Sequence, residues 1–224
     1  MVDSRAEIAP VEMSAWVRMP RQERARRSFE RVLAAGAELL IEQGYEGFSM
    51  SEVCRRASLS PGALYDRVDG KDMLFLAIHQ RELNRIAADA ETRFAQSPRW
   101  TAMPTSELVT ETVRELALHF LREQKLLRVF ILRAAVDDRV RDEGSRISRR
   151  TGDAVIALLL TRTEDYPHPK PETAVHTAFR LAFETLSWRT AFGFDFAESD
   201  VDTPERWIDQ LIMVTRSYLM TAPG

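Results

Sequence analysis

The 224-residue sequence has little of what builds covalent frameworks or membrane spans. It contains one cysteine, Cys54, so an internal disulfide and a cysteine-based zinc cluster are excluded, and this usage is typical of a reducing cytoplasm. No apolar run approaches the ~18 residues of a membrane-spanning helix. The N-terminus carries acidic residues and lacks the continuous apolar stretch of a signal peptide. We therefore expect a cytoplasmic protein that does not associate with a membrane.

The motifs of common enzyme classes are missing as well. The four histidines, His79, His119, His168 and His176, show neither H-x-x-x-H nor H-E-x-x-H spacing, and there is no G-x-S-x-G motif. Cys54 lies within a segment of helical pattern, where a small side chain that fills space is the simpler interpretation. We therefore expect no enzymatic activity, no metal site and no cofactor.

Strand-like alternation is also absent, and nearly every long segment has the period of a helix, which predicts an all-α fold. A first helix around Phe29 is expected to stop at Gly44. Ser49 with Glu52 forms an S-x-x-E capping box that opens a short second helix. Ser60 followed by Pro61 is the N-terminus of a third, expected to run to about Val68. Asp69-Gly70 breaks that helix, and Lys71 opens a long fourth helix that reaches Pro98 and links two domains.

The sequence beyond Pro98 predicts a larger helical domain. The stretch 126–136 is apolar almost all round, as expected of a helix enclosed by others or lining a cavity. Residues 140–163 are interrupted by Gly144 and Gly152, so one helix or two remain possible. The domains are then residues 1–20, a flexible arm; residues 21–74, three short helices; and residues 75–224, the larger helical domain.

The last two predicted helices, 172–193 and 204–221, each carry two apolar stripes. Such a hairpin buries both stripes if it pairs with its copy in a second subunit, which predicts a homodimer through a four-helix bundle. The alternative is that both stripes are internal to one chain. The residues assigned to the partner-facing stripe are Ala174, Leu181, Thr185, Trp207, Leu211, Val214 and Tyr218.

The net charge of −3 offers no general case for a nucleic-acid partner, but its distribution is uneven. The six arginines at positions 18, 21, 24, 26, 27 and 31 stand against only Glu23 and Glu30. This local excess is either a solvated helix start or a set of phosphate contacts.

A capped short helix, a tight joint and a second short helix form the arrangement that places one helix in the major groove of DNA. Ser60 and Gly62 expose a hydroxyl and backbone N–H groups at a helix N-terminus, where a phosphate is favoured. Gly62 and Ala63 are small enough for close approach to base edges, and Tyr65 is long enough to reach them. Taken singly, each of these residues is also explained by a role in the fold alone, such as a turn, a core aromatic or a solvated cation. The residues expected at the DNA are Arg27, Ser49, Ser60, Pro61, Gly62, Ala63, Tyr65, Arg67 and Lys71.

The stretch 31–74 resembles the N-terminal DNA-binding domain of the tetracycline-repressor-like (TetR) family of transcriptional regulators. The matching residues are Gly44, Tyr45, Ser49, Val53, Ala57, Leu59, Ser60, Gly62, Leu64, Tyr65, Lys71 and Leu74. Three departures stand out. Arg67 replaces an aromatic or histidine, Val68 replaces phenylalanine, and Gly36 replaces a usual alanine at a loss of up to ~1 kcal/mol of helix propensity. Asp66 either faces away from DNA, pairs with an arginine such as Arg67, or accepts from a cytosine amino group.

The resemblance implies a helix-turn-helix domain joined to a ligand-binding and dimerisation domain. It implies a homodimer that binds a palindromic operator with recognition helices ~34–36 Å apart, acting as a repressor that is released when a small molecule binds the second domain. The small molecule is expected to bind in an apolar pocket whose two polar side chains are His119 and Arg133. The alternative function is a helical small-molecule-binding protein with no DNA-binding role. The residues expected at the ligand are His119, Phe120, Phe130, Arg133, Phe179, Phe183 and Trp188.

Overall fold

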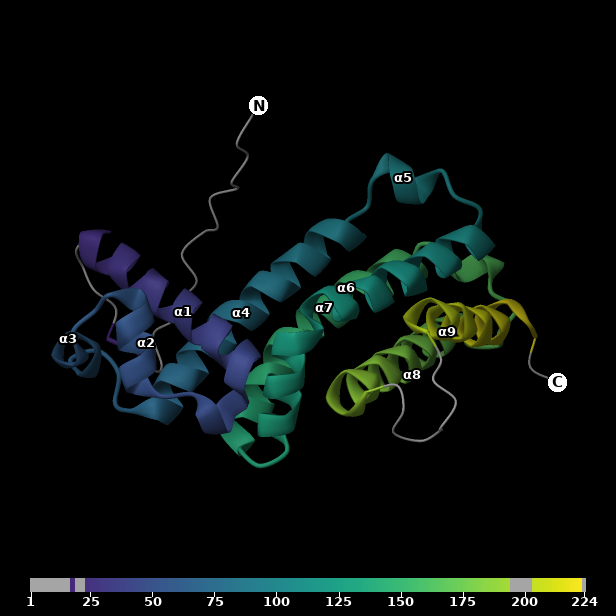
Figure 1. Ribbon diagram of the computed structural model, residues 1–224. Coiled ribbons are helices and arrows are strands. Elements are labelled where there is room, and N and C mark those ends of the chain that lie inside the picture. Colours follow the sequence, from purple (N-terminus) through teal and green to yellow (C-terminus); the bar gives the residue numbers. More distant parts are fainter. Residues whose placement is uncertain (1–16, 19–22, 194–202, 223–224) are drawn as a thin grey trace. The chain divides into compact units, whose positions relative to one another are not determined.

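The computed structural model describes residues 17–18, 23–193 and 203–222, which form helices and turns with no strand among them (Figure 1). The predicted all-α fold is thus confirmed. The chain divides into two compact units, the first ending at Arg85 and the second beginning at Ile86. The division falls inside the long helix α4, Lys71–Phe94, which we expected to link two domains. The predicted boundary, between residues 74 and 75, lies near the start of the same helix. Of the predicted arm, residues 1–20, only Val17 and Arg18 are among the described residues.

The first unit contains α1 (Glu23–Gly47), α2 (Met50–Ala57), α3 (Pro61–Tyr65) and the first part of α4. Gly44 has a φ of 66°, outside the helical region, so the regular part of α1 ends at the predicted residue. The helices enclose a core whose large side chains are completely or almost completely buried. Its members include Phe29, Leu33, Leu40, Phe48, Val53, Leu64, Val68, Leu74, Phe75 and Ile78.

Both predicted helix caps of this unit are present. The Ser49 hydroxyl oxygen accepts a hydrogen bond from the Glu52 backbone N–H at 3.3 Å, and that of Ser60 accepts from the Ala63 N–H at 3.4 Å. The third helix is shorter than predicted, since it ends at Tyr65 rather than near Val68. Val68 is fully buried, and the chain must turn there to bring its side chain into the core before α4 begins.

Gly36 of α1 lies directly against Ile78 of α4. A Cβ atom at Gly36 would lie 2.4 Å from Cδ1 of Ile78 and 3.5 Å from the ring of Phe48. Any side chain at position 36 would therefore overlap Ile78. This contact gives a physical reason for a glycine at the position where the family that this stretch resembles usually has alanine.

The second unit contains the rest of α4 and α5 (Pro98–Thr101), α6 (Thr105–Ala134), α7 (Asp138–Leu160), a 3-10 turn (Thr163–Asp165), α8 (Pro171–Phe192) and α9 (Pro204–Met220). The long helix α6 packs against α7, α8 and α9, and α8 also packs against α7 and α9 (Figure 1). None of the described helices combines the length and the apolar character that crossing a bilayer requires.

Two uncertainties about this unit are settled. Residues 138–160 form one helix. Gly152 is buried within it, and a Cβ at that position would lie 3.0 Å from the ring of Phe179. Residues 126–134, the end of α6, are not enclosed on all sides, as one of the two expectations had it. Leu126, Leu127 and Phe130 are buried, whereas Leu132 is 41% exposed.

Candidate nucleic-acid interface

The short helix α3 is anchored by one side chain and open along the rest of its surface. Leu64 is fully buried, whereas Ser60, Pro61 and Gly62 are exposed and Tyr65 is 53% exposed. A Cβ built on Gly62 would meet no atom within 4 Å. The first unit thus presents a hydroxyl, a glycine backbone and an aromatic ring on one open helix, the set expected for contact with a duplex.

Lys71 is held at the start of α4 by its neighbours on α1. Its ammonium group lies 4.4 Å from the ring centroid of Tyr45 and donates to the Glu46 carbonyl at 3.4 Å. Tyr45 itself donates its hydroxyl proton to the Asp72 carboxylate and meets Phe75 edge-on at 5.1 Å. The position of this cation is therefore set before any partner arrives.

The structure corrects the prediction for Arg67. Its guanidinium donates to the Ala25 carbonyl at 3.1 Å and lies 6.0 Å from the ring of Phe29, so it faces α1. Because α3 ends at Tyr65, residue 67 lies past the last turn and does not share the exposed face of Tyr65. In this position Arg67 holds the end of α3 against α1.

The residues before α1 reach the same place. The Arg18 backbone N–H donates to the Arg67 carbonyl at 3.0 Å, and its guanidinium donates to the Asp66 carbonyl at 3.4 Å and lies 3.6 Å from the Asp69 carboxylate. The Asp66 side chain remains exposed. Because the Arg67 guanidinium donates to Ala25 on α1, the structure does not show the ion pair between Asp66 and Arg67.

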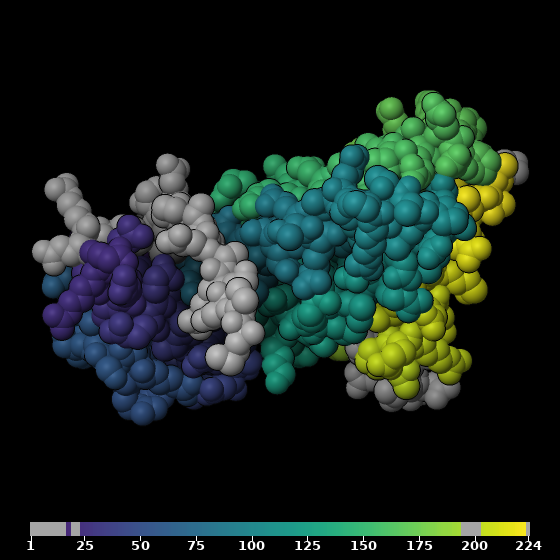
Figure 2. Space-filling model, turned by 90° about the horizontal axis from the view of Figure 1, so that it is seen from above, coloured from purple at the N-terminus to yellow at the C-terminus, as the bar shows by residue number. Residues whose placement is uncertain are grey.

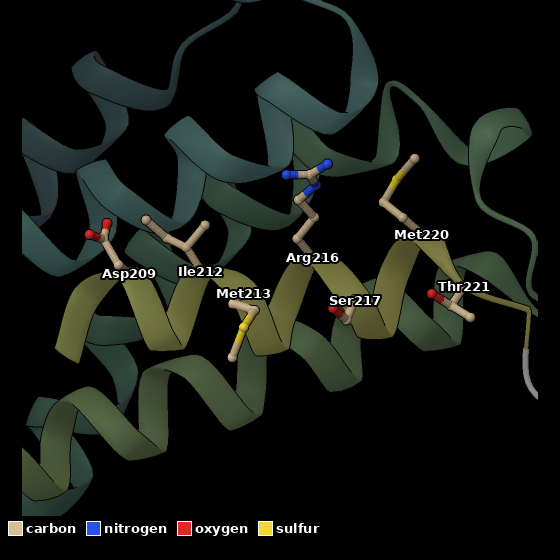
Figure 3. A pocket seen from close by; sticks show the side chains of 7 residues that line it. All are labelled: Asp209, Ile212, Met213, Arg216, Ser217, Met220 and Thr221. Carbon is tan, nitrogen blue, oxygen red and sulfur yellow. The ribbon is translucent and has the colours of Figure 1, made fainter. Parts of the chain in front are cut away.

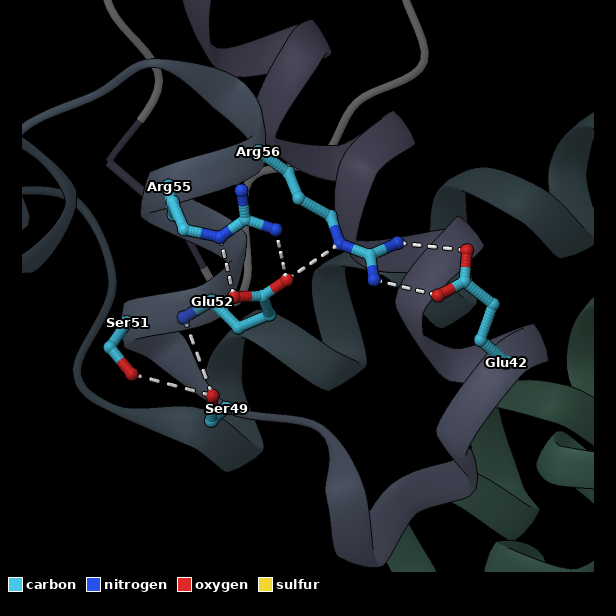
Figure 4. A network of polar contacts seen from close by, with 6 residues as sticks. All are labelled: Glu42, Ser49, Ser51, Glu52, Arg55 and Arg56. Carbon is cyan, nitrogen blue, oxygen red and sulfur yellow. Dashed lines mark hydrogen bonds and ion pairs between the residues drawn. The ribbon is translucent and has the colours of Figure 1, made fainter.

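A network of charges on α2, absent from the sequence prediction, ties that helix to α1 (Figure 4). The Glu52 carboxylate accepts from Arg55 at 2.6 and 2.8 Å and from Arg56 at 3.0 Å, and Arg56 also donates to Glu42 at 2.6 and 2.9 Å. Hydrogen bonds from the two arginines lower the pKa of Glu52 to about 2. The i, i+3 and i, i+4 spacing of these residues was the available sequence signal.

In the second unit, three of the predicted ligand-contacting aromatic residues gather in one place. The ring of Phe183 lies 5.2 Å from that of Phe120 and 5.4 Å from that of Phe179, between centroids. Phe130 is buried on α6, and Arg133 near the end of that helix donates to Asp137 at 3.3 Å. Trp188, which we expected to contact the ligand with these residues, does not join this cluster. It is 52% exposed, and its ring packs on that of Phe192 with 4.4 Å between centroids.

The structure places His119, one of the residues expected at the ligand, inside the second unit. It is buried, and its Nδ1 lies 3.4 Å from the Asp89 carboxylate on α4. Burial lowers the pKa of His119. Among the described residues, neither its Nε2 nor the buried hydroxyl of Thr112, two helical turns earlier, has a hydrogen-bond partner. Sequence reasoning missed Thr112, although its i, i+7 spacing to His119 placed both on one face of α6.

The outer stripe of α8 and α9 is exposed as a group, with two exceptions. Leu181, Thr185, Val214 and Tyr218 are exposed and Leu211 is half-buried, but Ala174 and Trp207 are buried within the unit. The guanidinium of Arg189 lies over the Trp207 ring, 5.4 Å from its centroid. Because Ala174 and Trp207 are both buried within the unit, neither belongs to the exposed stripe.

Trp188, Phe192 and Met213 add further exposed apolar surface to these two helices. The yellow helix α9 forms part of the molecular surface in Figure 2. An open groove of about 400 Å³ runs along α9, and its lining side chains all project from the last helix and the residue after it (Figure 3). They are Asp209, Ile212, Met213, Arg216, Ser217, Met220 and Thr221.

Comparison with known proteins agrees with this geometry. Residues 32–78 match a family profile described as bacterial regulatory proteins, tetR family. The HTH-type transcriptional activator FasR of Mycolicibacterium smegmatis is 32% identical over 71 residues, which are 32% of this chain and 31% of that protein. The match thus spans about a third of the length of this curated relative.

Two solved structures share the fold over most of the chain. A TetR-family transcriptional regulator from Mesorhizobium loti has 19% sequence identity and a TM-score of 0.62, covering 88% of this chain and 98% of its own. The regulator FadR from Bacillus subtilis, solved with stearoyl-CoA, has 12% identity and a TM-score of 0.61, covering 85% and 98%. The stretch from α1 to α4 thus matches the tetR profile of bacterial regulatory proteins, and the fold of the chain is that of these two structures.

Proposed function

We propose that this protein is a transcriptional regulator that binds a palindromic operator as a homodimer, and that its affinity for DNA changes when a small molecule binds its second unit. The open face of α3 is the observation that carries the proposal. Helix α3 buries Leu64 and leaves Ser60, Gly62 and Tyr65 exposed, and a Cβ built on Gly62 would meet no atom within 4 Å. Ser49 and Lys71, at the N-termini of α2 and α4, supply further donors for phosphate oxygens.

Dimerisation is proposed through the exposed faces of α8 and α9. Exposing large apolar side chains on the surface of a helical hairpin to water costs free energy. A second copy of the same hairpin would bury them in a four-helix bundle. A two-fold axis then relates the two α3 helices, which fits half-sites one helical turn apart on a duplex. The proposed interface residues are Leu181, Thr185, Trp188, Leu211, Val214 and Tyr218.

The proposed effector site lies at the aromatic cluster on α6 and α8. Phe120, Phe179 and Phe183 offer an apolar surface, while His119 and Thr112 provide buried polar atoms that a ligand could satisfy. Helix α4 belongs to both units, so a ligand that shifts it would act on the DNA-binding unit. A swing from 1:99 to 99:1 between the two DNA-binding states needs ~5.5 kcal/mol of differential ligand affinity.

An acyl chain is the effector class that we favour. FadR was solved with stearoyl-CoA, and the aromatic cluster of this chain suits an apolar tail. Native mass spectrometry of the purified protein tests this directly: we expect co-purified or added long-chain acyl compounds to bind with one ligand per chain. Binding of polar aromatic compounds alone would contradict the acyl assignment and leave the DNA-binding proposal standing.

Repression is the mode that we propose, because a dimer seated on promoter DNA excludes polymerase by occupying the same surface. FasR carries the name of an activator, so the direction needs its own test. A reporter driven by the promoter next to the gene should lose expression when the protein is supplied. Increased expression would show activation instead.

A gel shift with the DNA flanking the protein's own gene tests the proposed function. We expect wild type to bind with a steep loss of affinity between low and moderate salt. Tyr65→Ala and Lys71→Ala should both weaken binding without unfolding the chain. A wild-type protein that binds effector but no duplex would favour the alternative, a ligand-binding protein without a DNA-binding role.

A further inference from the structure

The first two turns of α1 carry a row of arginines on the face opposite the core. Arg24, Arg27 and Arg31 are spaced i, i+3 and i+7, so their side chains lie along one stripe, and Ser28 falls within it. All three arginines are exposed, whereas Phe29 between them is fully buried. This start of α1, drawn in purple, forms part of the surface in Figure 2.

The stripe lines a cavity that also reaches the turn before α3. The cavity measures about 700 Å³, and its lining combines Glu23, Arg24, Arg27, Ser28 and Arg31 of α1 with Ser58. Ser58 caps the C-terminus of α2 with a left-handed φ of 52° and lies two residues before Ser60, which opens α3. The arginine stripe and the open helix therefore border the same joint of the chain.

The charges of this cavity do not cancel. Glu23 is its one carboxylate among the lining residues, and it accepts from Arg27 at 3.0 Å and pairs with Arg26 at 3.8 Å. Arg31 donates to the hydroxyl of Ser28 at 3.2 Å. Within the described part of the chain, no carboxylate lies at ion-pair distance from Arg24 or Arg31, so both guanidinium groups keep donors for an external anion.

We propose that this cavity, formed by Arg24, Arg27, Ser28, Arg31 and Ser58, binds phosphate groups of the DNA backbone beside the groove that α3 enters. Guanidinium groups bind phosphate oxygens with two parallel hydrogen bonds, and hydroxyls donate to the remaining oxygens. The inference rests on the proposed function, and it extends the protein's contact with DNA from the helix-turn-helix to the beginning of α1. A contact of this kind adds affinity for any sequence and fixes the orientation of α3, but it reads no bases.

The test compares the double variant R24A/R31A with the matched control R26A. Arg26 lies on the same two turns and pairs with Glu23, but it is not part of the cavity lining. Affinity for the DNA flanking the gene, and for an unrelated duplex of equal length, is measured between about 50 and about 200 mM salt. Each lost phosphate contact should reduce the slope of log K against log salt by about 0.9. We expect R24A/R31A to lower the slope by at least one such step and to weaken both duplexes equally, with R26A unchanged.

Two results would overturn the proposal, and they differ in what else they remove. If R24A/R31A keeps the wild-type slope while Y65A loses binding, the cavity is not a phosphate site and the proposed function stands. If wild type binds neither duplex, the proposed function fails and the cavity inference fails with it. Because all three replaced arginines are exposed, the variants should retain the wild-type melting temperature, which circular dichroism verifies.

Discussion

At the scale of single residues, the molecule separates side chains that stabilise it from side chains that are available to a partner. Gly62 illustrates the second kind. Its backbone does not need glycine, since its φ is not positive, and a Cβ there would meet nothing within 4 Å. A requirement for glycine at this position can come only from a surface outside the chain, and the proposed function supplies one in the duplex.

Gly62→Ala should therefore act in opposite directions on stability and on DNA binding. In the helix, alanine is favoured over glycine by up to about 1 kcal/mol, so the free energy of unfolding should rise slightly. Affinity for DNA should fall, because the added methyl group keeps α3 from close approach. Urea titration and fluorescence anisotropy measure the two effects. A variant that is more stable and binds as well as wild type would show that α3 does not approach DNA at Gly62.

His119 illustrates a buried group whose charge the fold disfavours. Burial lowers its pKa in the folded state below the ordinary 6.5, with Asp89 and Glu123 opposing that shift and Arg122 and Arg93 adding to it. The unfolded chain then binds a proton that the folded chain does not, so stability is complete above pH 6.5 and falls as the pH drops through that value.

The replacement His119→Gln removes this titration while keeping a polar side chain. Thermal melts of wild type should show a melting temperature that falls with pH below about 6.5, and the fall should be shallower in His119→Gln. Parallel pH profiles for the two proteins would contradict the assignment of a neutral buried His119.

At the scale of elements, the sequence predicts most helices because caps, glycine stops and apolar period agree locally. Ser49, Ser60 and Gly44 mark helix ends where we expected them, and α8 and α9 begin and end within a residue of prediction. The misses share one cause. The early end of α3, the incomplete burial of residues 126–134 and the orientation of Arg67 depend on neighbours that are distant in sequence.

The candidate site shows the same limit. Which residues lie on α3 could be read from the chain, but Arg67 turns to Ala25, 42 residues away, and Trp188 turns outward from the aromatic cluster. The arginine stripe on α1 was visible as a charge excess. The cavity that the stripe lines together with Ser58 depends on the tertiary fold, since no local sequence pattern joins residues 24 and 58.

The α1–α4 contact gives a test of packing at this scale. Gly36→Ala improves helix propensity yet places a methyl group 2.4 Å from Cδ1 of Ile78, so we expect a net destabilisation of about 1–3 kcal/mol. Ile78→Val removes that Cδ1 atom and alone should cost about 0.5–1.5 kcal/mol. In the double variant the alanine should be tolerated, so its loss should be well below the sum of the single losses. Additive losses in urea unfolding would show that the overlap does not determine the glycine.

At the scale of the whole molecule, the account requires two chains to act together. Val214 is 61% exposed on α9 and belongs to the proposed dimer face. Val214→Arg places a charge there and should convert a dimer into monomers, seen as a halved mass in analytical ultracentrifugation. Glu205→Arg, an exposed residue of the same helix that lies away from the face of Val214, is the control and should leave the mass unchanged. A wild-type protein that sediments as a monomer at micromolar concentration would contradict the proposed dimer.

The most direct measurement places a DNA-cleaving iron chelate at the C-terminal end of α3 and maps where the duplex is cut. The label is attached to Asp66→Cys, since Asp66 is exposed, whereas the native Cys54 is buried and burial raises the pKa of its thiol. An equally exposed position in the second unit, Asp153→Cys, serves as the control. The account predicts two clusters of cuts about one helical turn of DNA apart, ~34–36 Å, from the Asp66 label and none from the control. Absence of cutting from the Asp66 label, or equal cutting from both labels, would contradict it.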